Sequence, residues 1–124
     1  MNNEKIKILH MDNEEDVLSS VKTILEKEGF EVESVTRGQT AIDKIIANGF
    51  KLVLLDIMMP DLSGWDVFTR LMKTSPHVKV IFLSVLEISP ERKKQLIEHG
   101  VSDYILKPFD RADLVKRVKA ALYA

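Results

Sequence analysis

The sequence predicts an α/β fold in which a five-stranded parallel sheet is covered by helices on both faces. Apolar, β-branched runs alternate with segments of helical period along the 124 residues. The third and fourth runs are almost continuously apolar, which is typical of central strands buried on both sides. Strict alternation of strands and helices favours right-handed crossovers and therefore parallel strands. No linker, repeat or low-complexity segment interrupts the pattern.

Five short segments are predicted to be strands. The second of them alternates apolar residues with acids, and this pattern is typical of a strand at the edge of a sheet. The segments are KIKILHM (5–11), EVESV (31–35), KLVLLD (51–56), VKVIFLS (78–84) and SDYILK (102–107).

Apolar residues at helical spacing predict the intervening helices. Gly29 follows the first apolar face and Gly49 the second, each as a C-terminal stop. The helix near 91–98 is weaker because only Leu96 and Ile97 are plainly apolar. The clear faces are Val17, Leu18, Val21, Ile24 and Leu25; Ala41, Ile42, Ile45 and Ile46; and Leu114, Val118, Ala121 and Leu122.

Length and composition indicate one soluble domain that spans residues 1–124, since 45% of the residues are hydrophobic and 30% are charged. The absence of cysteine excludes disulfides and thiolate metal sites and fits a reducing compartment. No apolar run approaches the roughly 18 residues of a membrane span, and the N-terminus lacks the apolar stretch of a signal peptide. We therefore expect a cytoplasmic protein without a membrane partner.

The net charge of −1 is unevenly distributed. Residues 90–124 carry eight Lys and Arg residues against five Asp and Glu residues. This excess is too mild for a nucleic-acid surface, which usually carries a concentrated basic patch. Direct binding of nucleic acid is therefore not expected.

Polar residues collect where the predicted strands end, and ligands of parallel sheets bind outside this edge. Asp12 and Asn13 follow the first strand, Asp56 the third, Ser84 the fourth and Lys107 the fifth. Crowded carboxylates require a cation, and hard oxygen ligands suit Mg²⁺. An Asp placed between a metal ion and a Lys is suited to attack phosphorus, with the Lys and the Ser neutralising charge on the phosphoryl oxygens.

Each of these residues also has a simpler explanation. Asp12 and Asn13 are residues that cap helices, Asp56 suits a turn, Ser84 can be an ordinary strand-end hydroxyl, and Lys107 precedes a proline that ends a strand. His10, Met58 and Met59 are expected to pack rather than to react. The combination at four strand ends favours a site over coincidence.

At these residues the sequence resembles the receiver domain of response regulators, the chemotaxis-regulator-like family. The segments KILHMDNEED, LVLLDIMMPDLSG, VIFLS and YILKPF carry the resemblance, which covers essentially the whole chain. It implies a flavodoxin-like (βα)5 fold with strand order 2-1-3-4-5. It also implies a role in a two-component phosphorelay.

The resemblance assigns a role to each strand-end residue. Asp56 would accept a phosphoryl group from a histidine kinase or phosphotransfer protein. Asp12, Asp56 and the backbone carbonyl of Met58 would hold Mg²⁺ or Mn²⁺, while Ser84 and Lys107 would hold the phosphoryl oxygens. Activity as an enzyme would be limited to self-phosphorylation and slow self-dephosphorylation, with no further cofactor.

The resemblance also implies a switch. Tyr104 would turn inward together with Ser84, and the surface of the fourth helix, fifth strand and last helix would then act on a downstream protein partner or output domain. The chain would be a monomer or a weak dimer through this surface. The Lys107–Pro108 peptide is expected to be cis.

Two positions depart from the family pattern. Asn13 stands where a second acid is usual, so it could offer Mg²⁺ an amide oxygen but no charge, and Glu14 could compensate. Val85 stands where Ala or Gly is preferred, which would narrow access to Asp56. These departures favour one rival, a pseudo-receiver that acts by protein binding without phosphorylation.

Two other functions fit the sequence less well. A phosphatase of the haloacid-dehalogenase type uses an Asp-x-Asp pair, but the second position after Asp56 is Met58. A flavodoxin-like flavin carrier needs a phosphate-binding loop after the first strand, and DNEED at 12–16 would repel phosphate.

Overall fold

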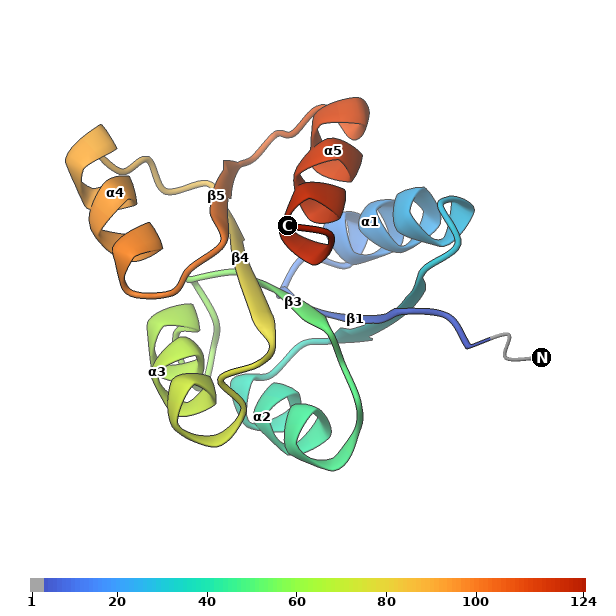
Figure 1. Cartoon of the computed structure of the whole chain (residues 1–124), viewed down its shortest axis with the longest axis horizontal. Coiled ribbons are helices and arrows are strands. Elements are labelled where there is room, and N and C mark those ends of the chain that lie inside the picture. The colour runs from blue at the N-terminus through green and yellow to red at the C-terminus, as the bar shows by residue number, and fades with distance from the viewer. Residues whose placement is uncertain (1–3) are drawn as a thin grey trace.

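The computed structural model describes residues 4–124, which form five strands and five helices in strict alternation (Figure 1). Strands and helices are β1 (Lys7–Met11), α1 (Glu15–Lys27), β2 (Glu31–Val35), α2 (Gly38–Ala47), β3 (Leu52–Leu55), α3 (Gly64–Thr74), β4 (Lys79–Ser84), α4 (Pro90–Glu98), β5 (Asp103–Leu106) and α5 (Arg111–Leu122).

All four strand pairs are parallel, and the sheet order is β2-β1-β3-β4-β5. The expected fold class is therefore confirmed. Helices α1 and α5 cover one face and α2 and α3 the other, while α4 lies beside the β5 edge (Figure 1). Because strand order reverses around β1 and β3, the carboxyl ends of these two strands flank the crevice where such sheets bind ligands.

Two apolar clusters hold the layers together. Leu54 in β3 packs with the α1 and α5 side chains, whereas its neighbour Leu55 packs with α2 and α3. Both leucines are fully buried, as are the other residues of β3. This explains the unbroken apolar run, since a central parallel strand has no solvent-facing side.

The edge position of β2 agrees with its alternating pattern. Gly29 ends α1 with φ +92°, a conformation that glycine adopts without penalty. Gly49 likewise follows the C-terminal end of α2, as predicted, but it does not take positive φ and so does not form the same cap as Gly29. Ile46 was wrongly placed on the apolar face of α2, since it is 58% exposed.

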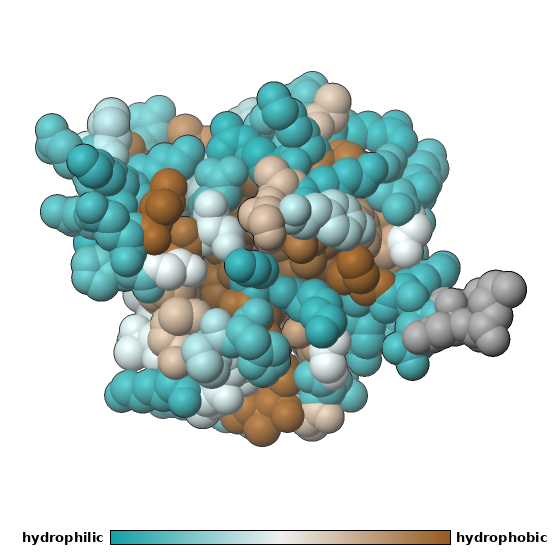
Figure 2. All heavy atoms as spheres, viewed as in Figure 1, coloured by the Kyte–Doolittle hydropathy of each residue, from teal (hydrophilic) through white to brown (hydrophobic). Residues whose placement is uncertain are grey.

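Helix α4 is attached mainly by one apolar side chain, as its weak pattern suggests. Leu96 is its only buried residue in the described chain, and Ile97 is half exposed. Ser89 caps the helix through the Arg92 N–H, and the Arg92 guanidinium lies 5.4 Å from the Trp65 ring centroid. Hydrophilic side chains dominate the surface around α4 (Figure 2). No helix in residues 4–124 has the length and hydropathy needed to cross a membrane.

Candidate functional site

Backbone hydrogen bonds continue the sheet for one residue beyond the strand ends and fix three of the predicted site residues. The N–H of Asp12 donates to Val35, that of Asp56 to Met11 and that of Lys107 to Ser84, at 3.1, 3.0 and 2.8 Å. Their side chains therefore leave rigid backbone at one edge of the sheet. The Lys107–Pro108 peptide is cis, as expected from the resemblance.

The Lys107 ammonium lies among three carboxylates. Its Nζ is 2.7 Å from Asp12 Oδ2, 3.1 Å from Glu14 Oε1 and 3.2 Å from Asp56 Oδ2. The side chains of Asp12, Asp56 and Lys107 are almost fully buried, whereas that of Glu14 is half exposed. Three residues predicted from separate strands thus meet, and Glu14 joins them from the solvent side.

The two buried carboxyl groups have different acidities. Burial raises the pKa of Asp12, but the nearby His10, Lys107 and the Glu14 N–H outweigh it and lower the pKa to about 2. Burial and the charge of Asp12 raise the pKa of Asp56 above 3.8, and Lys107 only partly opposes this. Asp12 is therefore an anion at neutral pH, and Asp56 is the more basic and so the more nucleophilic of the two carboxylates.

The ammonium group of Lys107 stays charged. Burial alone lowers the pKa of Lys107, but contacts with Asp12 and Glu14 and the charge of Asp56 raise it above 10.5. A cation is thus held beside the Asp56 carboxylate at neutral pH.

The backbone of the loop after β3 packs closely around Asp56. The Met58 N–H donates to Asp56 Oδ1 at 3.3 Å, and the Gly64 N–H donates to the Ile57 carbonyl at 3.0 Å. A Cβ on Gly64 would lie 2.5 Å from the Asp56 carbonyl oxygen. Gly64 is therefore required for the loop to fold back on the strand end. The Met58 side chain is exposed.

Ser84 and Tyr104 meet at the backbone of Leu86. The Leu86 N–H donates to Ser84 Oγ at 3.3 Å, and the Tyr104 hydroxyl donates to the Leu86 carbonyl at 2.6 Å. Ser84 and Tyr104 are both buried in this structure, and the predicted movement of Tyr104 on phosphorylation stays a prediction. Burial raises the pKa of the Tyr104 hydroxyl, which therefore stays protonated and donates.

The donor set suits a hard divalent cation. One carboxylate oxygen from each of Asp12, Glu14 and Asp56 lies within 4.8 Å of the other two. Carboxylate oxygens of this kind are the usual ligands of Mg²⁺. Asn13, the weaker of the expected ligands, is exposed.

Sequence reasoning missed two neighbours of the site. Glu14 was expected only as a possible substitute for a missing acid, because the sequence does not show in which direction its side chain points. His10 was expected to pack, and it is fully buried, but its Nε2 lies 3.6 Å from Asp12 Oδ2. Within residues 4–124 neither ring nitrogen of His10 has a hydrogen-bond partner. His10 and Asp12 are two residues apart in an extended segment, so their side chains lie on the same face. This spacing was the signal in the sequence that could have predicted the contact.

Residues 8–119 match the model of the response regulator receiver domain. The chain belongs to this family. The receiver domain is 38% identical over 119 residues to the uncharacterized transcriptional regulatory protein YkoG of Bacillus subtilis, covering 96% of this chain and 52% of YkoG. It spans about half the length of the curated relatives it matches.

Solved receiver domains have the same fold. A CheY-like receiver domain protein from Methanospirillum hungatei superposes with a TM-score of 0.87 at 32% identity, covering 97% of this chain and 95% of that one. TrrA of Thermotoga maritima, solved in complex with Mg²⁺-BeF, superposes with a TM-score of 0.81 at 29% identity, covering 94% of this chain and 99% of that one. Receiver domains of two-component response regulators are typically signalling domains rather than enzymes.

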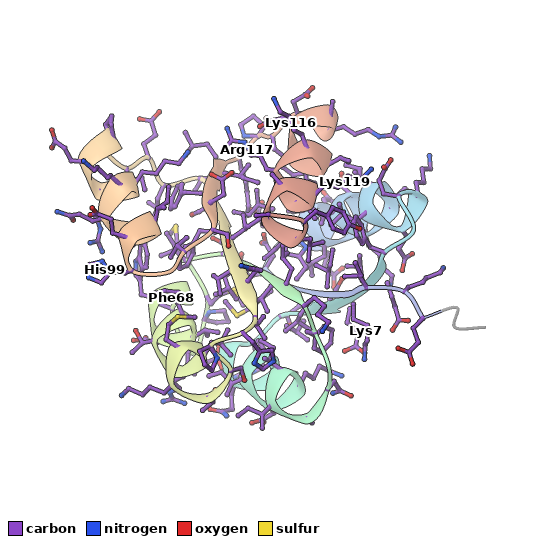
Figure 3. All side chains as sticks on the ribbon, viewed as in Figure 1. Lys7, Phe68, His99, Lys116, Arg117 and Lys119 are labelled. Atoms are coloured by element: carbon purple, nitrogen blue, oxygen red, sulfur yellow. The ribbon has the colours of Figure 1, made fainter. Side chains whose placement is uncertain are left out.

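An ion-paired network covers part of the α4-β5-α5 surface of the receiver domain. Arg117 on α5 reaches toward β5 (Figure 3), where its Nη1 lies 3.0 Å from Asp103 Oδ1. Lys93 on α4 lies 3.3 Å from the same oxygen, so Asp103 joins all three elements. Leu106, at the end of β5, is 42% exposed beside them.

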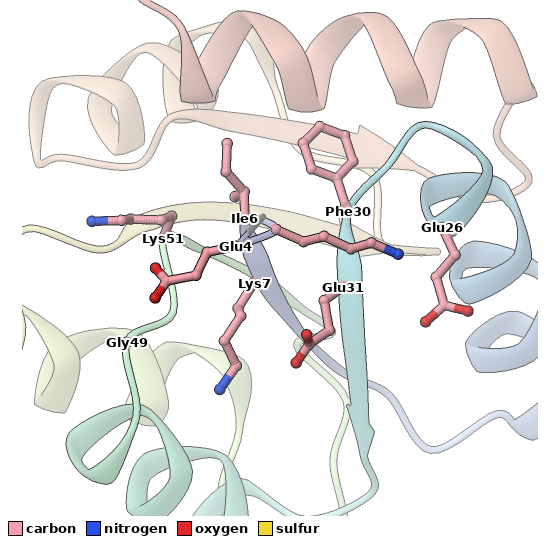
Figure 4. Close-up of a pocket in the computed structure, with 9 residues that line it drawn as sticks. Glu4, Ile6, Lys7, Glu26, Phe30, Glu31, Gly49 and Lys51 are labelled. Carbon is pink, nitrogen blue, oxygen red and sulfur yellow. The ribbon is translucent and has the colours of Figure 1, made fainter. Parts of the chain in front are cut away.

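A cavity of about 830 Å³ lies at the opposite edge of the sheet, where Lys7 of β1, Glu31 of β2 and Lys51 line it (Figure 4). These residues precede or begin their strands, so this cavity is separate from the strand-end site. Another cavity, of about 500 Å³, lies beside the site and is lined by Glu14, Val85 and Lys107 among others.

Proposed function

We propose that this receiver domain accepts a phosphoryl group on Asp56 from a histidine kinase or phosphotransfer protein. The observation that carries the proposal is the position of the Lys107 ammonium, 3.2 Å from the Asp56 carboxylate and 2.7 Å from Asp12. The raised pKa of Asp56 and the lowered pKa of Asp12 support separate roles for them as nucleophile and charge holder.

In the proposed transfer, an Asp56 oxygen attacks the phosphorus of a phosphohistidine. The new O–P bond forms as the P–N bond breaks, and the electron pair of that bond leaves with the imidazole, which takes up a proton. Lys107 stabilises negative charge on the equatorial oxygens. Ser84 is buried at the neighbouring strand end, where its hydroxyl accepts from the Leu86 N–H and is free to donate its own proton to one of these oxygens.

Asp12, Asp56 and the Met58 carbonyl would hold Mg²⁺ or Mn²⁺, which supplies charge neutralisation for the transferring oxygens. The carboxylate cluster supports this role, and the Mg²⁺-BeF complex of TrrA supports it by analogy. Asp56 would therefore both bind the cation and accept the phosphoryl group.

Phosphorylation would change the α4-β5-α5 surface and so control a partner or an output domain. A phosphoryl group shifts an equilibrium only by interacting differently with its two states. Ser84 would supply such a difference because its hydroxyl proton would donate to a phosphoryl oxygen that only the phosphorylated protein has. The single buried side chain of α4 supports its displacement at small cost.

The test is incubation with acetyl phosphate and Mg²⁺, followed by mass spectrometry of the intact protein and mapping of the adduct. We expect one added phosphoryl group on Asp56 and none on Asp56→Asn. Label on another residue, or equal label on the variant, would refute the assignment.

The alternative function is that of a pseudo-receiver, which is favoured by one observation. Asn13 brings no charge and its side chain is exposed, which weakens the cation site at the position of the second acid. A pseudo-receiver would stay unlabelled with both acetyl phosphate and a phosphorylated kinase, and yet bind its protein partner.

A further inference from the structure

Glu14 lies at the start of a helix but does not cap it. It occupies the N-cap position of α1, and among the described residues its side chain accepts no capping hydrogen bond. Ser, Thr, Asp or Asn at this position would fold back to accept from the first helical N–H groups. Here Glu14 Oε1 instead lies 3.1 Å from the Nζ of Lys107, a residue 93 positions along the chain.

Asp12 holds Glu14 in this position. Its Oδ1 accepts from the Glu14 N–H at 3.0 Å, while its Oδ2 lies 2.7 Å from Lys107. The Glu14 backbone is thus fixed to one carboxylate of the site, and its side chain extends over the solvent side of the others.

The Lys107 ammonium is held at the centre of these carboxylates. It contacts one oxygen from each of Asp12, Glu14 and Asp56, at 2.7–3.2 Å. Three carboxylates and one ammonium leave a net charge of −2 in this cluster, which a divalent cation balances. Without Glu14 the cluster would carry only −1.

We propose that Glu14 supplies the third carboxylate to the divalent cation, in place of the acid that is absent at position 13. This inference rests on the proposed function, since it concerns the cation required by the Asp56 reaction. Mg²⁺ retains several water ligands, so Glu14 acts either directly or through one of these waters. Its half-exposed side chain can make either contact without burying a further charge.

The test is a titration with MgCl₂ alone at fixed ionic strength, followed by Trp65 fluorescence and by calorimetry. Trp65 adjoins Gly64, which packs on the Asp56 backbone. Glu14→Gln should weaken Mg²⁺ binding by ~10–100-fold, the usual effect of removing a supporting group at a metal site. Glu15→Gln removes the same charge one residue away, outside the carboxylate cluster, and should bind as the parent does.

A double variant separates loss of the ligand from damage to the fold. Asn13→Asp combined with Glu14→Gln should regain affinity, because it returns the acid to position 13. Equal affinities of Glu14→Gln and Glu15→Gln, with Asp56→Asn impaired, would overturn the role of Glu14 and leave the proposed function standing. Equal affinities of the parent and Asp56→Asn would overturn both.

Discussion

The hydroxyl of Tyr104 and the carbonyl oxygen of Leu86 are 2.6 Å apart, in a hydrogen bond that ties β5 to the loop after β4. The N–H of the same Leu86 donates to Ser84 Oγ at 3.3 Å. One loop residue is therefore held by both residues expected to form the switch. In the proposed switch, movement of Ser84 toward a phosphoryl oxygen would also move the Leu86 N–H bonded to it, and Leu86 would pass this movement to Tyr104.

Ser84→Ala should retain phosphorylation at Asp56 but lose much of the structural response, because the hydroxyl that would donate to the phosphoryl group is gone. The measurement is the change in amide chemical shifts at residues 90–110 on addition of beryllofluoride and Mg²⁺, a phosphoryl mimic. Tyr104→Phe is the companion variant, since it removes only the hydrogen bond to the Leu86 carbonyl. A complete response in Ser84→Ala would mean that coupling does not run through the hydroxyl.

Asp56→Asn should stabilise the metal-free protein at neutral pH, because it removes a buried carboxylate that lies beside the charge of Asp12. The pKa of Asp56 is raised on folding by burial and by the charge of Asp12. The folded state therefore binds the proton more tightly, and stability falls as pH rises from the unfolded value of 3.8 through the higher folded value. The Asp56→Asn variant should not lose stability in this way, because the amide does not titrate.

Mg²⁺ should reverse this order in denaturant unfolding experiments. A concentration of 100 Kd adds about 2.7 kcal/mol to the free energy of unfolding of the parent. The variant lacks one ligand and should gain less. The prediction fails if Asp56→Asn is the less stable protein without Mg²⁺.

The sequence predicted the fold because two independent signals agreed. Leu54 and Leu55 lie in an unbroken apolar run that only a doubly covered strand requires, and β2 alternates as an edge strand does. The prediction that Ile46 is buried was wrong, because helical spacing does not tell which apolar residue lies at the margin of a buried face. The strand order came from resemblance, since alternation alone fixes parallel pairing but not the order of strands.

The candidate site was predicted only as far as the strand ends. Asp12, Asp56 and Lys107 were expected together because parallel strands end at one edge, and they meet there. Glu14 lies beyond the strand, where the direction of a side chain depends on how the helix begins. The contact of His10 with Asp12 likewise depends on side-chain conformation rather than on spacing.

Asp61→Ala should destabilise the domain by ~1 kcal/mol, as the loss of an N-terminal cap does. Asp61 lies in the loop after β3, and its two carboxylate oxygens accept from the N–H groups of Gly38 and Gln39 at the start of α2, at 2.8 and 3.0 Å. These bonds lower the pKa of Asp61 to about 2. The Asp61 carboxylate thus joins the loop after β3 to the start of helix α2.

The pH dependence of this contribution has a defined sign. Because the folded pKa of Asp61 is depressed, the stabilisation is complete above the unfolded value of 3.8 and is lost as pH falls through about 2. Urea unfolding of the parent and of Asp61→Ala should therefore differ at pH 6 and converge toward pH 2. A constant difference over this range would show that the charge of Asp61 is not responsible.

Gly64→Ala should damage both stability and phosphorylation. A Cβ at this position would lie 2.5 Å from the Asp56 carbonyl oxygen and 2.9 Å from the Cα of Ile57. Both are backbone atoms, so the contact cannot be relieved by turning a side chain, and the loop must move away from Asp56. We expect a loss of ~1–3 kcal/mol, typical of overpacking, together with slower labelling of Asp56 by acetyl phosphate.

Gly49→Ala is the matched control. Its Cβ would meet no atom within 4 Å, and Gly49 has no positive φ, so the same substitution has room there. It should raise the free energy of unfolding by ~0.4–1 kcal/mol, because alanine has less conformational freedom in the unfolded chain. It should leave the labelling rate unchanged, since Gly49 lies at the far edge of the sheet, on the cavity that Lys7 and Lys51 line. If both variants label Asp56 at the parental rate, the close approach of Gly64 is a requirement of folding and does not position the acceptor.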